Sequence, residues 1–430
     1  MRKLRIVLVS YACDPSRGTE PGLGWAWALA LAQRGHTVDV LTRPDRENTR
    51  HIASHIASLG ATGRRIRPHF IPVPEISRWV ALVPGPVREQ TREFLNYDGW
   101  QRRALRYARG RGLAEADLVH HVSYGSLVGG SALRELGPPL VFGPVGGGQT
   151  APHSHRRFMG AGYQQEVLRE LLWVRGLSHR IACRATLREA ALVLTTNRDT
   201  ALRARRLGCA APRMLLADGI PEDLVCTSGD IAPGPTDRPT VLWVGRLTSF
   251  KAPRLALHTF SRLRGLVPEA RMMFLGDGPL RTEMEHLASR LGVAESVCFR
   301  GRVPWDQALA AYDEAHVLLF TSLRDSSGVQ TLEAWARGLP VVHLDHQGIG
   351  DFSAPGGAIP VPLGSPEDLP QRLAQALASV LTDAEARRRM KAAGRLWALR
   401  NTWTAKAELA EQLYRGILAD SPPIRDRSMS

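Results

Sequence analysis

The sequence predicts an α/β protein built from two doubly wound domains that face one another across a cleft. The chain has 430 residues, which is more than a single hydrophobic core usually supports. In both halves, short apolar runs alternate with helical stretches, as in a parallel sheet covered by helices. Ligands of such sheets bind beyond the carboxyl ends of the strands, so the cleft is the expected site.

The first half of the chain contains six candidate strands, each a short apolar run bounded by turn-forming or charged residues. They are 6–11, 37–42, 69–74, 117–122, 139–145 and 191–196, with a helix over 22–34. This series predicts an N-terminal domain over residues 1–232.

A second series starts after the segment 233–239, whose three prolines favour a linker. The expected strands are 240–245, 271–278, 297–301, 317–322 and 340–344, with helices over 252–266, 279–291, 305–315 and 328–337. This series predicts a second domain over residues 240–400, and the chain stays strongly helical beyond about Asp383.

Composition narrows the class of protein. With 44% hydrophobic residues the chain is globular, and no apolar run approaches the roughly 20 residues needed to span a bilayer. The five cysteines are dispersed and odd in number, which favours a reduced cytoplasmic protein. The net charge of +15 suits phosphorylated ligands or the anionic inner face of a membrane. No nucleic-acid partner is expected, because the arginines lack interleaved aromatic residues and a helix-turn-helix.

The segment from Leu323 to Val342 carries the strongest chemical signal. It places Asp325 and Glu333 eight positions apart around a Ser-Ser-Gly helix start. Free backbone N–H groups at a helix start suit an anionic ligand, and a carboxylate accepts hydroxyl groups. The alternative is an ordinary helix, capped by Asp or Ser, with a Glu at its buried edge.

Two cations follow the first strand of the second series. Arg246 and Lys251 lie on the loop from that strand to the next helix, where they can neutralise a diphosphate. The alternative is a pair of solvated surface charges.

The segment from Leu323 to Val342 resembles the donor-site motif of the retaining GT-B glycosyltransferases of the family-four, or group 1, type. That motif is Glu-Gly-Phe-Gly-Leu-x-x-x-Glu followed by Ala-x-x-x-Gly-x-Pro-Val. The matching residues are Gly328, Glu333, Gly338, Pro340 and Val341. The first acid departs from the motif, because Asp325 stands where Glu is usual, and Ser326 and Ser327 replace Gly and the aromatic residue.

The resemblance implies two Rossmann-like domains and a hexosyltransferase that moves a sugar from a nucleotide diphosphate-sugar to an acceptor hydroxyl with retention. Arg246 and Lys251 would stabilise the leaving diphosphate, helped by the amides near Gly328 and Val329. Asp325 would orient the sugar, and Glu333 would bind the ribose. The tail, 401–430, would pack back on the N-terminal domain. No cofactor or metal is expected, and the sequence contains no Asp-x-Asp pair.

The resemblance also assigns loops elsewhere. The remaining donor-side candidates are Gly276, Gly278, Arg302, Gly18, Glu20 and Gly22. Gly146, Gly147 and Gly148 form a glycine-rich loop expected on the acceptor side. A histidine near the end of the strand 117–122 would contact the donor sugar, with His121 preferred to its neighbour His120.

Two other functions stay open at this stage. A sugar phosphorylase of the same architecture would consume inorganic phosphate instead of a sugar nucleotide. A non-catalytic protein could use the basic stretches 76–110 and 163–188 to bind a membrane or nucleic acid. In an enzyme, the same stretches would suit peripheral contact with an anionic leaflet during polysaccharide biosynthesis on a lipid-linked acceptor.

Overall fold

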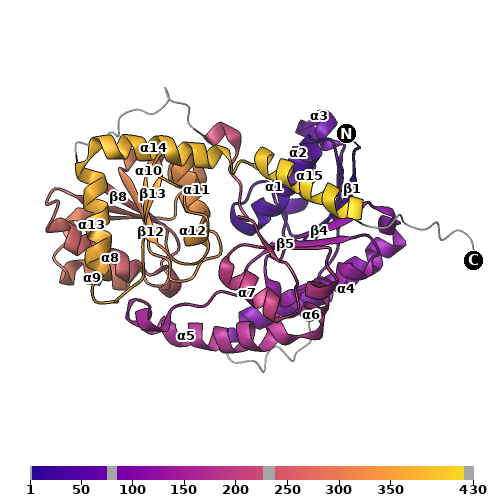
Figure 1. Ribbon diagram of the computed structural model, residues 1–430, viewed down its shortest axis with the longest axis horizontal. Helices are drawn as coiled ribbons and strands as arrows, with labels where there is room; N and C mark the ends of the chain where they lie inside the picture. Colours follow the sequence, from indigo (N-terminus) through magenta and orange to yellow (C-terminus); the bar gives the residue numbers. More distant parts are fainter. Residues whose placement is uncertain (1, 75–84, 226–237, 421–430) are drawn as a thin grey trace, which may run out of the picture.

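The computed structural model describes residues 2–74, 85–225 and 238–420. It contains two α/β domains side by side, as Figure 1 shows. The expected boundary at residue 232, most of the linker 233–239, the start of the stretch 76–110 and the end of the tail 401–430 lie outside the described residues. None of the described helices combines the length and apolar character needed to cross a membrane.

The N-terminal domain is built on a seven-stranded parallel sheet. Its strands are β1 (Arg5–Ser10), β2 (Thr37–Thr42), β3 (Ile66–Phe70), β4 (Leu118–Ser123), β5 (Leu140–Val145), β6 (Leu192–Thr195) and β7 (Arg213–Met214), in the order β3-β2-β1-β4-β5-β6-β7. Its helices are α1 (Thr19–Gln33), α2 (Asn48–Ser58), α3 (Gly60–Gly63), α4 (Gly85–Gly110), α5 (Gly162–Arg169), the π-helix η6 (Glu170–Gly176), α6 (Ile181–Glu189) and α7 (Arg198–Arg206). The strand order reverses between β1 and β4.

The C-terminal domain repeats this plan on a six-stranded parallel sheet. Its strands are β8 (Thr240–Val244), β9 (Arg271–Leu275), β10 (Val297–Gly301), β11 (Val317–Phe320), β12 (Val341–Leu344) and β13 (Ala358–Val361), in the order β10-β9-β8-β11-β12-β13. Its helices are α8 (Pro253–Arg264), α9 (Arg281–Arg290), α10 (Trp305–Glu314), α11 (Val329–Ala336), α12 (Gln347–Asp351), α13 (Leu369–Thr382) and α14 (Ala384–Leu399), and the last helix of the chain is α15 (Trp403–Asp420). Here the order reverses between β8 and β11.

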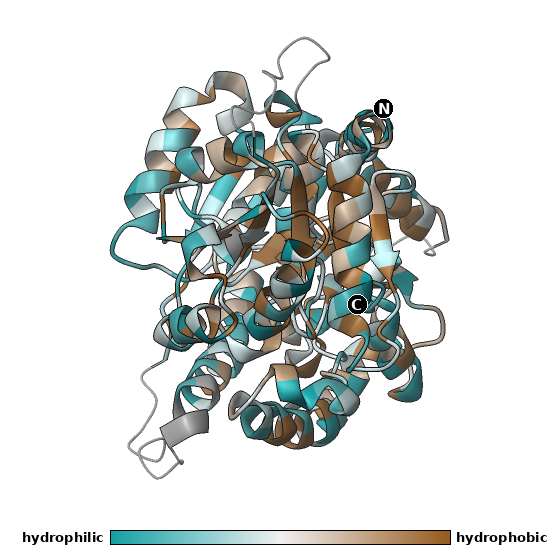
Figure 2. Ribbon diagram, turned by 90° about the vertical axis from the view of Figure 1, so that its left-hand side faces the viewer, coloured by the Kyte–Doolittle hydropathy of each residue, from teal (hydrophilic) through white to brown (hydrophobic). Residues whose placement is uncertain are grey.

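Each sheet is buried on both faces, which explains its nearly continuous apolar strands. In β1, Val7 and Val9 face the core under α4, while Ile6 and Leu8 face the core under α1 and α15. Side chains alternate between the two faces of a strand, so the six residues of β1 contribute side chains to both cores. Figure 2 shows the strands as a brown, apolar centre between helices with hydrophilic outer faces.

The structure revises several predicted elements. The strand expected over 69–74 is β3, which starts earlier and ends at Phe70. As the edge strand, β3 tolerates Pro68, but Pro72 and Pro74 follow closely and remove two more N–H donors beyond Phe70. The short strands β7 and β13 were not predicted, because runs of two and four residues carry too little periodicity.

The chain crosses between the domains before β8 and again before α15. At these crossings Ile220 N–H donates to Asn401 O (3.1 Å) and Trp403 N–H donates to Ile220 O (3.1 Å). Helix α15 then packs on the N-terminal domain beside α1, where Arg34 pairs with Glu411 at 2.6 Å. The yellow end of the chain therefore lies over the indigo beginning in Figure 1.

A segment of the N-terminal half also belongs to the C-terminal domain. Ala151, Phe158 and Met159 are buried in the same core as α8 and α13, and Tyr163 packs against it. The short helix η5 (His153–Phe158) contacts α8, and α5 contacts the loop that carries Lys251. In Figure 1 the magenta segment around α5 extends beneath the C-terminal domain. We call residues 149–176, which run from the loop after β5 through η6, the interdomain strap.

Candidate functional site

The loops at the two strand-order reversals meet in one cavity of about 570 Å³ between the domains. Glu20 follows β1 and Tyr124 follows β4, while Lys251 follows β8 and Asp325 follows β11. All four residues line this cavity. Ligands of doubly wound sheets bind at such reversal points, so the cavity is the best candidate site. We call it the central cavity.

Lys251 and Asp325 form an ion pair in the central cavity. Burial works to raise the pKa of Asp325, but the Lys251 ammonium and the hydrogen bonds from Lys251, Ser322 and Ser326 together hold that pKa below its ordinary value. The Asp325 N–H donates to Gln347 Oε1 (2.9 Å), and Gln347 Nε2 donates across to Thr150 O on the strap (2.7 Å). The pair is therefore held in place from its backbone as well as from its charges.

The start of α11 supplies further N–H groups beside that pair. Gly328 has a left-handed φ of 70° and passes directly into the helix at Val329. A Cβ on Gly328 would lie 3.1 Å from the Phe320 ring, so both φ and space favour glycine here. Gly328 and Val329 both line the central cavity, where unpaired N–H groups of a helix start suit an anion.

Asp218 joins the central cavity to a second one. It lies on the crossing after β7 and accepts a hydrogen bond from Ser327 Oγ at 2.5 Å. Burial raises the pKa of Asp218, against the opposing effects of Ser327 and of the buried Lys406 on α15. Asp218 lines both cavities, so they form one continuous cleft.

The second cavity, of about 700 Å³, extends from Glu333 toward α1, and we call it the outer cavity. Glu333 accepts hydrogen bonds from Tyr312 Oη (2.6 Å) and Trp305 Nε1 (3.5 Å). Burial raises the pKa of Glu333 against these two donors. Trp305 is 53% exposed, which leaves a ring face available at the mouth. An indole beside a carboxylate can take a base and its ribose hydroxyls.

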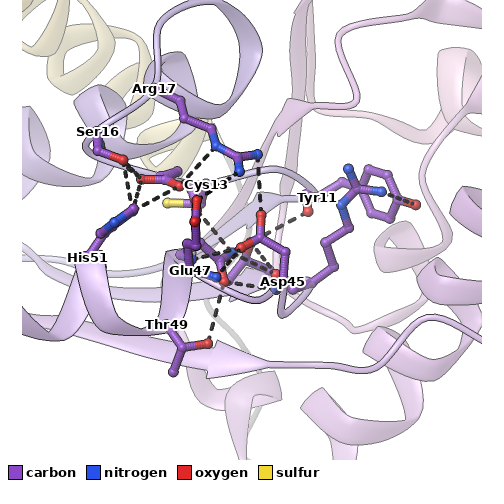
Figure 3. A network of polar contacts seen from close by, with 12 residues as sticks. Tyr11, Cys13, Ser16, Arg17, Asp45, Glu47, Thr49 and His51 are labelled. Carbon is purple, nitrogen blue, oxygen red and sulfur yellow. Dashed lines mark hydrogen bonds and ion pairs between the residues drawn. The ribbon is translucent and has the colours of Figure 1, made fainter.

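The loop after β1 brings Gly18 and Gly22 to the outer cavity. Figure 3 shows how polar contacts hold this loop: Arg17 reaches Asp45 at 3.5 Å and Glu47 at 3.5 Å on the next loop of the sheet. A Cβ on Gly22 would lie 2.2 Å from Arg17 O, so the turn into α1 requires glycine. The network sets the start of α1 and hence the position of its glycines.

The glycine-rich loop after β5 also meets the cleft. Gly147 lines the central cavity, and a Cβ on Gly146 would lie 2.7 Å from Ser326 Oγ of the opposite domain. Gly148 N–H donates to Thr200 Oγ1 (3.1 Å) and faces a separate hollow beside α7. Gln149 Nε2 donates to Ser326 Oγ (2.8 Å), which ties this loop to the C-terminal domain.

Other expected donor residues lie outside the linings of the two cavities. Arg246 and Arg302 are exposed on loops of the C-terminal sheet. Gly276 has φ 124°, and a Cβ there would lie 2.1 Å from Gly245 O. A Cβ on Gly278 would lie 2.6 Å from Leu247 O. These two glycines allow close contact between the loops after β8 and β9, which is a structural role in this conformation.

His121 is likewise away from the cleft. It is fully buried in β4, where its Nε2 bonds to Tyr97 Oη (2.8 Å) and its Nδ1 to Ser131 Oγ (2.7 Å). Burial lowers the pKa of His121 to about 3, so the ring is neutral at physiological pH. His120 is also buried, between Gly143 O and Tyr414 Oη, each at 2.7 Å. The structure therefore brings neither histidine to the central cavity, because hydrogen bonds hold each ring inside the N-terminal domain.

Sequence reasoning did not find several residues of the central cavity. They are Phe94, Tyr124, Gln149, Arg169, Trp173, Asp218 and Arg324. Asp218 follows β7, whose two residues gave no strand signal, so nothing placed its loop at the carboxyl edge of the sheet. Arg324 adjoins Asp325 in sequence and forms a bidentate ion pair with Glu166 on the strap (2.7 and 3.0 Å). Within the described residues, no group of three side chains suited to a metal ion occurs.

Comparison with known proteins defines the class. The fold is a two-domain Rossmann-like architecture of the GT-B type, shared with solved glycosyltransferase structures. Residues 230–397 match the family model "Glycosyl transferases group 1", and residues 25–218 match the model "Glycosyl transferase 4-like domain". Together these matches span most of the chain. It belongs to the group 1 glycosyltransferase family.

Curated relatives match over shorter stretches. The chain is 32% identical over 186 residues to a GDP-mannose-dependent α-(1-6)-phosphatidylinositol monomannoside mannosyltransferase of Mycolicibacterium smegmatis, covering 41% of this chain and 48% of the relative. It is 29% identical over 227 residues to a 2-deoxystreptamine glucosyltransferase of Streptomyces kanamyceticus, covering 50% and 57%. The matched part thus spans about half the length of these relatives.

Solved structures align over nearly the whole chain. A sucrose-phosphate synthase from Thermosynechococcus elongatus superposes with a TM-score of 0.67 at 20% identity, covering 98% of this chain and 100% of that one. HepE of Anabaena, crystallised with UDP and glucose, superposes with a TM-score of 0.61 at 16% identity, covering 95% and 99%. At these identities the likeness establishes the fold.

Proposed function

We propose that this protein is a retaining glycosyltransferase that moves a hexosyl group from a nucleotide diphosphate-sugar to an acceptor hydroxyl without a metal ion. The observation that carries the proposal is the convergence of Lys251, Asp325 and the start of α11 in one cavity that continues to Glu333. Cation and helix start suit a diphosphate, Asp325 suits the sugar hydroxyls, and Glu333 suits the ribose. Family membership and the UDP complex of a structural neighbour support a nucleotide-sugar donor.

Each residue of the site has a different role in the proposed transfer. Lys251 and the N–H groups at Gly328 and Val329 stabilise charge on the departing diphosphate, and Asp325 keeps the sugar oriented. In a retaining transfer without a covalent intermediate, the acceptor hydroxyl attacks from the face that the diphosphate leaves, and a leaving phosphate oxygen takes its proton. Arg246 is exposed on the same loop as Lys251, and it would reach the diphosphate only by turning inward.

Donor binding tests this proposal directly. A thermal-shift screen with UDP, GDP, ADP and dTDP should raise the melting temperature with at least one of them, because binding stabilises the native state. Lys251→Ala should weaken that shift, while Arg389→Ala on the exposed face of α14 should not. Release of an α-configured sugar from an α-linked donor, followed by NMR, tests retention, and full activity in EDTA tests metal independence. A phosphorylase would instead require inorganic phosphate.

A second surface supports contact with an anionic membrane. Helices α4, η6 and α6 expose large apolar side chains, among them Leu171 (52%), Leu172 (43%) and Ile181 (88%). Exposed arginines lie on the same helices, including Arg175 on η6 and Arg184 and Arg188 on α6. Apolar side chains that enter a headgroup region, ringed by cations, are typical of peripheral membrane binding. A lipid-linked acceptor would then be presented at the cleft.

Liposome sedimentation tests the membrane contact. The protein should bind vesicles of phosphatidylcholine with 30% phosphatidylglycerol and leave pure phosphatidylcholine largely unbound. Leu171→Gln with Leu172→Gln should reduce binding. The matched control is Leu396→Gln with Leu399→Gln on α14, where the leucines are 61% and 49% exposed on the other domain. Equal binding by both double variants would contradict the assigned surface.

A further inference from the structure

Glu20 lines the central cavity, and its two carboxylate oxygens differ in their hydrogen bonds. Both hydrogen bonds that it receives, from Ser123 Oγ (3.1 Å) and Gly125 N–H (2.9 Å), end on Oε1. Among the described residues, no hydrogen bond reaches Oε2. Burial raises the pKa of Glu20 against these two donors, which is the expected state of a carboxylate held in a partly dry cleft. One oxygen thus fixes the side chain, and the other is available to a ligand.

Aromatic rings flank this carboxylate. Phe94 of α4, Tyr124 after β4 and Trp173 of η6 line the same cavity. Phe94 and Trp173 pack with ring centroids 5.5 Å apart, and Tyr124 packs against Tyr97 at 5.1 Å. Burial also raises the pKa of Tyr124 to about 12, so its phenol stays neutral. Phe94 and Trp173 thus support one another, Tyr97 supports Tyr124, and the three rings give the cavity an apolar lining.

The carboxylate and the aromatic rings lie in a different domain from the residues proposed to bind the donor. Glu20, Phe94 and Tyr124 belong to the N-terminal domain, whereas Lys251 and Asp325 belong to the C-terminal domain on the other side of the cavity. A volume of about 570 Å³ is in the range of cavities that enclose a ligand of drug-like size. The cavity therefore has room for a second small ring beside a donor sugar.

We propose that Glu20, Tyr124, Phe94 and Trp173 form the acceptor subsite, and that it takes a ring-shaped polyhydroxy compound, a pyranose or a cyclitol. A ring of this kind has an apolar C–H face, which packs on aromatic side chains, and hydroxyl groups at its edge, which donate to a carboxylate. Glu20 Oε2 receives one of these hydroxyls. The inference deepens the proposed transferase and rests on it.

Substitution of Glu20 by Gln separates ligand binding from a purely structural role. The amide oxygen still accepts from Ser123 and Gly125, so the loop after β4 keeps its anchor. The outward oxygen becomes an NH₂ group, and the charge is lost. Hydrogen bonds to a charged group are about twice as strong as those between neutral groups, so affinity for a hydroxyl ligand should fall about tenfold or more.

Saturation-transfer NMR provides the test, with wild-type protein saturated with the nucleoside diphosphate that it binds best. The probes are methyl α-D-glucopyranoside, methyl α-D-mannopyranoside, methyl α-D-galactopyranoside and myo-inositol, with the acyclic polyol D-mannitol as the comparison. At least one ring probe should receive saturation at its C–H protons, and D-mannitol should receive much less. Glu20→Gln and Trp173→Leu should both reduce the transfer, while their melting temperatures stay near that of the wild type.

Matched variants of the outer cavity distinguish this inference from the proposed function. Glu333→Gln and Trp305→Leu should weaken nucleoside diphosphate binding and leave transfer to the ring probe unchanged. Glu20→Gln should do the reverse. If no ring probe receives saturation, or if Glu20→Gln and Trp173→Leu retain the full signal, the acceptor subsite is wrong even where diphosphate binding succeeds. Absence of diphosphate binding would instead contradict the proposed function.

Discussion

At the residue scale, the central cavity contains a cation that is already paired. Lys251 and Asp325 neutralise one another across the cleft wall, so neither presents a full charge to an approaching ligand. In the proposed function, a diphosphate that approaches Lys251 would compete with Asp325 for the ammonium, and Asp325 would then become available to sugar hydroxyls. The pair would thus couple diphosphate binding to orientation of the sugar.

Removal of Lys251 should change the pH dependence of turnover. Lys251 lowers the pKa of Asp325, so in Lys251→Met that pKa rises. Turnover that needs the ionised carboxylate should then be lost at a higher pH on the acid side than in the wild type, in addition to a fall of about tenfold or more at neutral pH. The pH profile of donor hydrolysis measures both effects. An unchanged acid limb would contradict the role given to the pair.

Glu333 should make donor binding sensitive to acid. Its pKa is raised above the ordinary 4.5, so the carboxylate becomes protonated at a pH where an exposed Glu would still be charged. The Kd for the nucleoside diphosphate should rise as pH falls through that value, and Glu333→Gln should weaken binding about tenfold and remove the dependence. Calorimetric titration from pH 4.5 to 7.5 measures this. The control is Glu285→Gln, at a partly exposed acid on α9 that pairs with Arg281 away from both cavities.

The sequence was enough to place some of these residues at the cleft, but not others. Lys251, Asp325 and Glu333 lie directly after strands or on a helix with clear periodicity, so the sheet itself dictates where they go. Phe94 and Trp173 come from helices that no local pattern ties to the cleft. His121 was expected there because the family resemblance implies a histidine near the end of this strand, but whether a residue in β4 faces a core or a cavity depends on packing by Tyr97 and Ser131.

At the element scale, glycines set how closely the loops of the C-terminal sheet approach. Gly276 N–H donates to Gly301 O (2.8 Å), while its Cα faces Gly245 O across the loop after β8. That loop continues to Lys251. A side chain at Gly276 would separate the two loops and displace the cation without touching the ligand.

Gly276→Ala should therefore destabilise the protein far more than the same substitution at a glycine that has a similar φ but free space where the Cβ would lie. Its φ is 124° and the added Cβ would lie 2.1 Å from Gly245 O, so we expect a loss above about 2 kcal/mol in the free energy of unfolding. Gly137 has φ 123° with nothing within 4 Å, and Gly137→Ala should lose about 1 kcal/mol. Urea unfolding of the two variants gives the comparison, and equal losses would show that contact with Gly245 is unimportant.

At the scale of the whole molecule, a buried lysine lies at the crossing between the domains. Lys406 of α15 donates to Leu216 O (2.6 Å) and is 2% exposed. Burial lowers its pKa from 10.5 to about 7, and Asp218 only partly opposes this. The lysine therefore links α15, the crossing after β7 and the carboxylate that joins the two cavities.

Lys406 should make the free energy of unfolding depend on pH. Between about pH 7 and 10.5 the unfolded protein binds a proton at Lys406 that the folded protein has released, so folded stability rises with pH by about 1.4 kcal/mol per pH unit from this group. Lys406→Met removes that slope. The difference in free energy of unfolding between wild type and variant should thus shift in favour of the wild type from pH 7.5 to 9. A constant difference would indicate a lysine that stays charged.

The strap has a consequence for how relatives of this protein are recombined. Phe158 and Met159 are supplied by the N-terminal half of the chain but are buried with α8 and α13. A chimaera that joins residues 1–225 to the second half of a relative would therefore deliver these two side chains to a foreign core. Exchange of donor specificity by grafting should succeed only when residues 149–176 travel with the second half, even though they are not contiguous with it.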